Sequence, residues 1–326
     1  MKDVSRLVTA LCIIALFAAM PTLAALAGQS SLVTLSARVM IYAMAAASLN
    51  FILGYGGMIS FGHAAFFGIG TYTVGILAHH LASGEALFGI IPGSGSMLVT
   101  LPSAILVSGL AAAAIGALSL RTGGVQFIMI TLAFAQMLFF FFVSLSTYGG
   151  EDGIIIDQTN SVPGLDMRKK AVAYYFILGV AVVYFLALWR LIHSSFGEII
   201  SGIRQNERRM TALGIATYRY KLAAFILAGM GAGLAGALLA NYLRFASPDA
   251  MYWTKSGELM IMVILGGVGS FFGPILGAAA LLVLEYYLAS WTEHWSLLLG
   301  IVLLLVVLGT RGGLSGLILR LRGERS

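Results

Sequence analysis

Apolar runs of helical length fill most of this chain, and they restrict its fold more than any other feature. A helix needs about 20 apolar residues to cross a bilayer. Ten runs reach or approach that length, at residues 7–28, 32–54, 58–79, 98–120, 124–146, 171–192, 221–243, 258–269, 272–289 and 296–309. Outer-membrane barrels would show short alternating segments instead. We therefore predict an all-α polytopic membrane protein, with residues 1–326 forming a single transmembrane domain of about ten hydrophobic helical segments.

The composition agrees with this class. The chain is 60% hydrophobic and 10% charged, whereas soluble domains average about 25% charged residues. The single cysteine, Cys12, excludes an intrachain disulfide. The net charge of +6 is too small and too scattered to indicate nucleic-acid binding, and in a membrane protein it is interpreted as a topology signal.

One apolar stretch is interrupted. Run 258–269 is too short to span alone, and it joins run 272–289 through the glycine-rich segment 266–274. This segment is either a tight turn between two spans or part of a broken or re-entrant helix, and the sequence leaves both open. Glycines four residues apart, such as Gly229 and Gly233, favour close helix packing.

Positive charges divide unequally when the chain crosses ten times from a cytoplasmic N-terminus. Thirteen of the 19 Lys and Arg residues then lie inside. The others lie outside or at that interface: Arg38, Arg168, Lys169, Lys170, Arg244 and Lys255. An inside excess is the usual orientation signal, so we expect both termini, including a basic tail at 310–326, in the cytoplasm. Run 7–28 also resembles a cleavable signal peptide, and the second run begins outside in either case.

Polar residues within the apolar runs mark candidate functional positions. The stretch 48–77 contains seven glycines, one asparagine and one histidine. Polar side chains at membrane depth usually face protein or water, and glycines permit close backbone approach. The candidates for the translocation path or for helix packing are Asn50, Gly56, Gly57, His63 and Gln136. Glu285 either lines the path or lies near the outer end of its run.

The loop 193–220 is the longest polar segment on the inner side. Its middle section predicts one short helix, because Ile199, Ile203 and Met210 form an apolar stripe. An apolar stripe among charges needs a surface to pack on, which suggests docking to a cytosolic partner. The alternative is a basic loop that only fixes topology.

No catalytic motif accompanies these segments. The chain contains no HExxH sequence and no serine nucleophile elbow. The GxGxxG sequence at 231–236 lies inside an apolar run with no preceding strand, which argues against a dinucleotide site. We therefore expect a protein that is not an enzyme, with no catalytic, cofactor or metal site of its own.

Four blocks of sequence resemble the branched-chain amino acid permeases of the ABC-transporter class, LivM type. They are LNFILGYGGMISFGHAAFFGIGTYT at 49–73, RTGGVQFIMITLAFAQM at 121–137, SSFGEIISGIRQNERRMTALGIATYRYKLAAFILAGMGAGLAGAL at 194–238 and ELMIMVILGGVGSFFGPILGAA at 258–279. The blocks occur in the family's order and cover most of the chain between residues 49 and 279.

The resemblance implies a multi-pass subunit of an ATP-driven importer in a bacterial inner membrane. Such a subunit moves branched-chain or related amino acids by alternating access. Its implied partners are membrane lipid, a second homologous permease, two cytosolic ATPase subunits that bind ATP and Mg, and a periplasmic substrate-binding protein. Alternative substrates in the family are urea, short amides and aromatic acids. An ion-coupled secondary transporter is disfavoured, because it would need acids in mid-membrane.

The resemblance also assigns roles to two loops. Loop 193–220 matches the segment that contacts the ATPase, which makes Glu198, Arg204, Gln205, Asn206, Glu207 and Arg208 the candidate coupling residues. ABC importers often carry a glycine six residues after the loop glutamate, but here Gly202 follows Glu198 by four. In the outer loop 147–170, the candidates for a landing surface for the binding protein are Glu151, Asp152 and Asp157. The alternative is a solvated loop.

Overall fold

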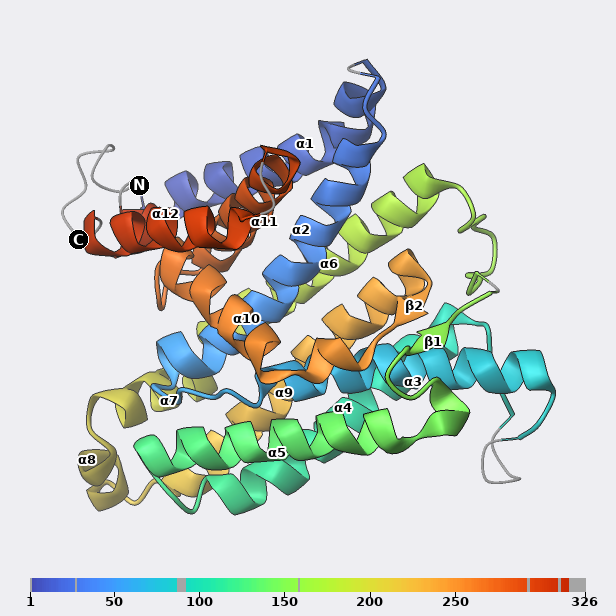
Figure 1. Ribbon diagram of the computed structural model, residues 1–326. Helices are drawn as coiled ribbons and strands as arrows, with labels where there is room; N and C mark the ends of the chain where they lie inside the picture. The colour runs from blue at the N-terminus through green and yellow to red at the C-terminus, as the bar shows by residue number, and fades with distance from the viewer. Residues whose placement is uncertain are drawn as a thin grey trace.

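The computed structural model describes residues 2–26, 28–86, 92–157, 159–291, 294–309 and 312–316, and it is mostly helical (Figure 1). In chain order the elements are α1 Lys2–Leu26, α2 Ser31–Asn50, the π-helix η1 Phe51–Tyr55, α3 His63–Ser83, α4 Met97–Ser119, α5 Val125–Ser144, the 3-10 helix η2 Ser146–Tyr148, β1 Ile154–Ile155, α6 Lys170–Ile192, α7 Ser195–Gln205, α8 Glu207–Ala212, α9 Thr217–Leu243, β2 Phe245–Ala246, the 3-10 helix η3 Pro248–Met251, α10 Trp253–Gly266, α11 Gly273–Trp291 and α12 Trp295–Gly309. The predicted tail 310–326 lies outside the described residues except for 312–316.

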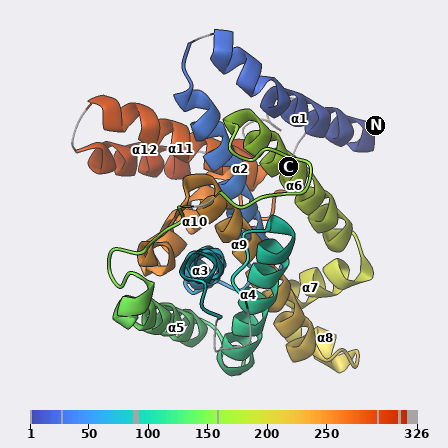
Figure 2. The same ribbon diagram turned by 90° about the vertical axis from the view of Figure 1, so that its right-hand side faces the viewer.

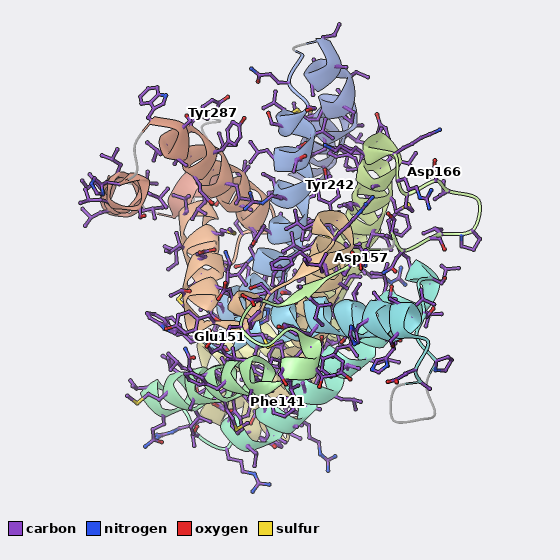
Figure 3. All side chains as sticks on the ribbon, turned by 45° about the vertical axis from the view of Figure 1, so that its right-hand side comes forward. Phe141, Glu151, Asp157, Asp166, Tyr242 and Tyr287 are labelled. Carbon is purple, nitrogen blue, oxygen red and sulfur yellow. The ribbon has the colours of Figure 1, made fainter. Side chains whose placement is uncertain are left out.

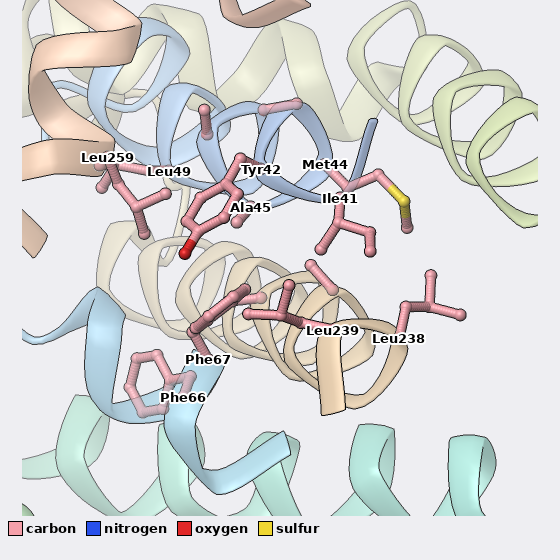
Figure 4. Packing of buried hydrophobic residues seen from close by; sticks show 14 of the residues in the cluster. Ile41, Tyr42, Met44, Ala45, Leu49, Phe66, Phe67, Leu238, Leu239 and Leu259 are labelled. Carbon is pink, nitrogen blue, oxygen red and sulfur yellow. The ribbon is translucent and has the colours of Figure 1, made fainter. Parts of the chain in front are cut away.

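α3 lies at the centre of the molecule. Viewed along its axis, it is surrounded by α4, α5, α9 and α10 (Figure 2), and its residues from 63 to 72 are all buried. Of the apolar window of α2, 78% is buried, compared with 6% for α1. Side chains of α2, α3 and α9 interleave in this core, where the ring of Tyr42 lies 5.7 Å from that of Phe67 (Figure 4).

The core helices approach so closely that several positions admit only glycine. A methyl group on Gly70 of α3 would overlap the carbonyl group of Gly233 on α9, and one on Gly236 would overlap the carbonyl group of Phe67. One on Gly229 would lie 2.5 Å from a side chain of α4. Within lipid, helices gain no hydrophobic free energy by associating. Small residues favour association instead, because they let the backbones come into van der Waals contact. The predicted packing role of Gly229 and Gly233 is confirmed.

Seven helices in the described part of the chain are long and apolar enough to cross a membrane. They are residues Val8–Leu26 of α1, Ser31–Tyr55 of α2 and η1, and helices α4, α5, α6, α9 and α11. All ten apolar runs overlap a helix, but α10 and α12 have only 14 and 15 residues. α3 has 21 residues, but its glycines, hydroxyls and histidines make it less apolar. Length and composition thus support seven of the ten expected spans.

The bundle surface is apolar, as a lipid-facing surface should be. Leu110 of α4, Met129 of α5 and Val183 of α6 are 71%, 67% and 67% exposed. Soluble monomers rarely expose large contiguous apolar patches. The exposed side chains on three separate helices therefore agree with the membrane class predicted from the sequence.

The interrupted stretch forms two helices joined by a tight turn. α10 ends at Gly266 and α11 begins at Gly273. The helices cross at glycines, because a methyl group on Gly277 would overlap the backbone of α10. Within the turn, Gly267 and Gly269 have φ angles of +114° and +78°, which residues with a Cβ rarely adopt. A turn thus joins α10 to α11, but α10 is not among the helices long enough to span, so whether this stretch is two spans or a broken or re-entrant helix stays a prediction.

The two ends of the bundle differ. α7 and α8 lie at one end, with the first turns of α1 and the last turns of α12 (Figure 1). Toward the other end lies a two-stranded antiparallel sheet, in which Ile154 pairs with Ala246 and Ile155 with Phe245. These ends are called the α7–α8 side and the sheet side below.

We expect Gly236→Ala to destabilise the bundle by about 1–3 kcal/mol or more, because the new methyl group forces α3 and α9 apart. Thermal unfolding of the purified protein in detergent measures the loss. Gly179→Ala in α6 is the matched control, since a methyl group there meets nothing within 4 Å. Equal melting temperatures for the two variants would contradict the packing argument.

Candidate functional site

Loop 193–220 folds into two helices instead of the single helix predicted. α7 ends at Gln205 and α8 begins at Glu207. Between them Asn206 is extended, with φ −159° and ψ 98°, and its Oδ1 accepts a hydrogen bond from the Arg209 amide at 3.0 Å. This cap satisfies a free amide in the first turn of α8, so a new helix starts there and the chain direction changes.

The apolar side of α7 packs on this chain and not on a partner. Ile200 and Ile203 are 1% and 4% exposed, and Met210 of α8 folds back against Gly202. Of the predicted stripe, Ile203 is buried, and Ile199 and Met210 are half-buried against the core, so the stripe already packs on this chain and does not require a partner surface. The side left free for a partner is polar.

Five of the six predicted coupling residues lie on the exposed side of α7 and α8, and the sixth, Arg204, is described below. Glu198 is exposed in the first turn of α7. A shallow open depression is lined by Gln205, Asn206, Glu207, Arg208 and Thr211. Glu207 also pairs with Lys221 at the start of α9, with 2.5 Å between Oε2 and Nζ. This ion pair ties α8 to a core helix while the depression remains open.

Arg204 turns back toward the membrane helices. Its guanidinium Nη1 donates a hydrogen bond to the carbonyl oxygen of Gly54 in η1. Carbonyl groups at a helix end lack an intrahelical donor, and Arg204 supplies one. Its aliphatic chain covers Gly57, where φ is +68° and a methyl group would lie 3.0 Å from Arg204 Cγ. A methyl group on Gly56 would lie 3.5 Å from Ile200 of α7, so the predicted coupling helix and glycine segment meet.

Asn50, the last residue of α2, connects this region to the turn between α10 and α11. Its Oδ1 accepts a hydrogen bond from the Gly269 amide, and its Nδ2 donates one to the Ser270 carbonyl, each at 2.9 Å. Asn50 is 3% exposed, and a methyl group on Gly54 would collide with Asn50 and Gly269. We call the set Arg204, Gly54, Gly57, Asn50 and Gly269 the Arg204 contact.

His63 lies apart from the Arg204 contact, at the start of α3. It is fully buried, and its Nε2 lies 2.7 Å from Ser48 Oγ. The Ser48 hydroxyl also lies 2.7 Å from the Ala45 carbonyl oxygen, to which it donates. Nδ1 has no partner within the described ranges, and the ring packs edge-on against Phe66. This is the geometry of a neutral histidine held by helix packing.

The non-helical residues 56–62 cross the interior between η1 and α3. The Phe61 amide donates to Thr131 Oγ1 of α5 at 3.3 Å, and the Ala64 amide donates to Ser256 Oγ of α10 at 2.9 Å. These hydroxyls satisfy backbone groups that lipid could not. Gln136 lies further along α5, half-buried, and its Oε1 has no hydrogen-bond partner in the described part of the chain.

The acidic candidates for a landing surface flank β1 on the sheet side. Glu151, Asp152 and Asp157 are all exposed, and Glu151 and Asp157 lie on the loop around the strand (Figure 3). They point into solvent with no metal site among them. Among the residues described, no group of three His, Cys, Asp or Glu side chains could hold a metal ion.

An ion pair that the sequence analysis missed lies in α10. Lys255 Nζ is 2.6 Å from Glu258 Oε2, and it lies 5.6 Å from the centre of the Tyr42 ring. Tyr42 is near the middle of the 25-residue candidate span Ser31–Tyr55, so Lys255 lies beside the middle of that helix and not beside its end. One feature of the sequence could have indicated this position: run 258–269 is too short to span, and a short helix between long ones can begin inside the bundle.

We expect Asn50→Leu to destabilise the protein by about 1–2 kcal/mol, because it leaves two half-buried backbone groups of the α10–α11 turn without their hydrogen-bond partners. Gln136→Leu, a change of the same shape, should be neutral or stabilising since it removes an acceptor that has no partner. Thermal unfolding in detergent compares them, and equal losses would contradict the role given to Asn50.

Comparison with known proteins gives relatives that cover most of the chain. It is 26% identical over 306 residues to the high-affinity branched-chain amino acid transport system permease protein LivM of Salmonella typhimurium, covering 86% of this chain and 69% of that protein. LivM of Escherichia coli K12 is 26% identical over 299 residues, 84% of this chain and 68% of that protein. The ribose import permease protein RbsC of Bacillus subtilis is 33% identical over 139 residues, 39% of this chain and 42% of that protein.

No solved structure matches the chain. The family described as the branched-chain amino acid transport system permease component matches residues 31–308. That range includes α2 to α11, the Arg204 contact and the polar depression, and therefore all of the core. The chain is thus a multi-pass membrane protein that belongs to the family of permease components of branched-chain amino acid transport systems.

Proposed function

We propose that this chain is the membrane subunit of an ATP-driven importer that carries branched-chain amino acids across a bacterial inner membrane by alternating access. The observation that carries the proposal is the similarity to two LivM permeases over 86% and 84% of the chain. Separate subunits bind ATP and Mg and perform the hydrolysis. This chain supplies half of the path, together with a second homologous permease.

In this proposal the α7–α8 side faces the cytoplasm, and an ATPase subunit docks on the exposed polar surface of α7 and α8. Polar and charged surfaces give specific and reversible docking. When the ATPase moves α7, Arg204 moves η1 through the Gly54 carbonyl, and Asn50 transmits the displacement to the α10–α11 turn. The coupling then runs through one contiguous set of packed and hydrogen-bonded groups.

The sheet side faces the periplasm in the same arrangement. A substrate-binding protein approaches the exposed acids Glu151, Asp152 and Asp157. Charge complementarity at such a surface steers the encounter and sets orientation more than it adds affinity. The substrate is released there into the space between the two permeases.

Other substrates are the second candidate. The ribose import permease and the Escherichia coli autoinducer 2 import system permease protein LsrC match 39% and 50% of this chain. These matches cover half of the chain or less, so they favour a sugar less strongly than the LivM matches favour an amino acid. Urea, short amides and aromatic acids are further candidates within the permease class, and an ion-coupled transporter is the least favoured.

Uptake by the reconstituted complex tests the substrate. The chain, a second permease and the ATPase subunits are placed in liposomes with ATP inside, and the substrate-binding protein is added outside. We expect uptake of radioactive leucine that requires ATP and that excess unlabelled isoleucine or valine suppresses. Ribose and urea should have no effect, and ribose uptake in place of leucine uptake would refute the amino acid proposal.

Arg204→Ala tests the coupling. We expect uptake to fall about tenfold, the size that a lost coupling free energy of about 1–3 kcal/mol predicts, while the ATPase subunits still co-purify and hydrolyse ATP. Arg190→Ala, at the exposed end of α6 and outside the proposed docking surface, is the charge-matched control. Loss of co-purification in Arg204→Ala would instead make Arg204 a docking residue, and unchanged uptake would contradict both roles.

A further inference from the structure

The chain from β2 to α10 runs into the bundle through loop residues and the short 3-10 helix η3, and α10 begins only at Trp253. A methyl group on Gly75 of α3 would lie 3.1 Å from Ala246 Cβ of β2, and one on Gly68 would overlap Met251 of η3. Ser256 then accepts the hydrogen bond from the first turn of α3. Residues 245–256 therefore follow α3 inward from its later turns to its start. Irregular backbone at this depth is tolerated where it is buried in protein or lines a water-filled space.

The Lys255–Glu258 ion pair lies at the inner end of this segment. The Lys255 ammonium faces the Tyr42 ring at 5.6 Å, and Tyr42 packs on Phe67 in the core (Figure 4). Tyr42 lies near the middle of its span. Both charges are therefore near the middle of the membrane, where charged side chains are costly and mark substrate or ion pathways.

One side of this ion pair is open. The side chains of Lys255 and Glu258 are 28% and 40% exposed, and a methyl group on Gly257 would meet nothing within 4 Å. Lipid cannot cover a half-exposed ion pair at this depth. The open side must therefore face water or another protein, and a path between two permeases provides both.

We propose that Lys255 and Glu258 form the substrate subsite of the path, where Lys255 binds the carboxylate and Glu258 the ammonium group of a zwitterionic α-amino acid. This inference rests on the proposed amino acid import. The ion pair and the zwitterion are each neutral overall, and Glu285 of α11 is a further acid near enough to act on Lys255, so the substrate can exchange partners with the pair while Lys255 keeps a carboxylate near it. An anion or a cation alone would leave one protein charge unpaired at low dielectric, which gives selectivity for zwitterions.

The test compares single and double neutral variants in the complete reconstituted complex. We expect Lys255→Met, Glu258→Gln and the double variant each to reduce leucine uptake by about tenfold or more, with the KM for binding-protein-delivered leucine raised. ATP hydrolysis stimulated by the loaded binding protein should persist. Arg190→Gln, an exposed charge change at the end of α6, is the control.

The double variant separates a binding role from a structural one. A purely structural ion pair can be replaced by two neutral side chains with little loss, so restored uptake in the double variant would overturn the inference. Thermal unfolding of each variant shows that the loss of uptake is not a loss of folding. If the wild-type complex takes up a sugar and no amino acid, the proposed function and the subsite are both overturned. If the wild-type complex takes up leucine and the double variant is fully active, only the subsite is overturned.

Discussion

The close approach of α3 to α9 is the constraint on which the rest of the structure depends. Gly70 faces the backbone of Gly233, and Gly236 faces the backbone of Phe67, so the two helices lie in direct backbone contact. In lipid no hydrophobic force drives this association, and packing of small residues has to supply it. The contact keeps the buried residues of α3 away from lipid and leaves α4, α5 and α6 with apolar side chains on the exterior.

A buried α3 permits irregular backbone on both sides of its first turn. Residues 56–62 reach the start of α3 from η1, and residues 245–256 reach it from the sheet side. Hydroxyl groups on α5 and α10 bond the backbone at this place: Thr131 accepts from the Phe61 amide in the first segment, and Ser256 accepts from the Ala64 amide in the first turn of α3. Such segments are tolerated only inside protein or beside water, and in transporters they commonly occur where substrate crosses the midplane.

The two proposals use different parts of this arrangement. The Arg204 contact lies at the α7–α8 side, where motion of a docked ATPase would enter the bundle through Gly54 and Asn50. The Lys255–Glu258 pair lies beside the start of α3, where a zwitterion would meet matched charges. α10 belongs to both proposals. Asn50 bonds to Gly269 and Ser270 in the turn that follows α10, and the first turns of α10 carry the ion pair. Movement at one end of this 14-residue helix would therefore be felt at the other.

The sequence by itself determined the membrane class, the approximate position of every helix and the location of the polar loop, because hydropathy and charge are local properties. It also identified Asn50, Gly57 and Arg204 as residues worth attention. Only the tertiary structure decided what each of them contacts. Arg204 and Gly54 are 150 residues apart, and Asn50 and Gly269 are 219 apart, so no local pattern could pair them. The division of the loop at Asn206, the burial of its apolar stripe and the depth of Lys255 likewise depended on which surfaces the folded bundle had already covered.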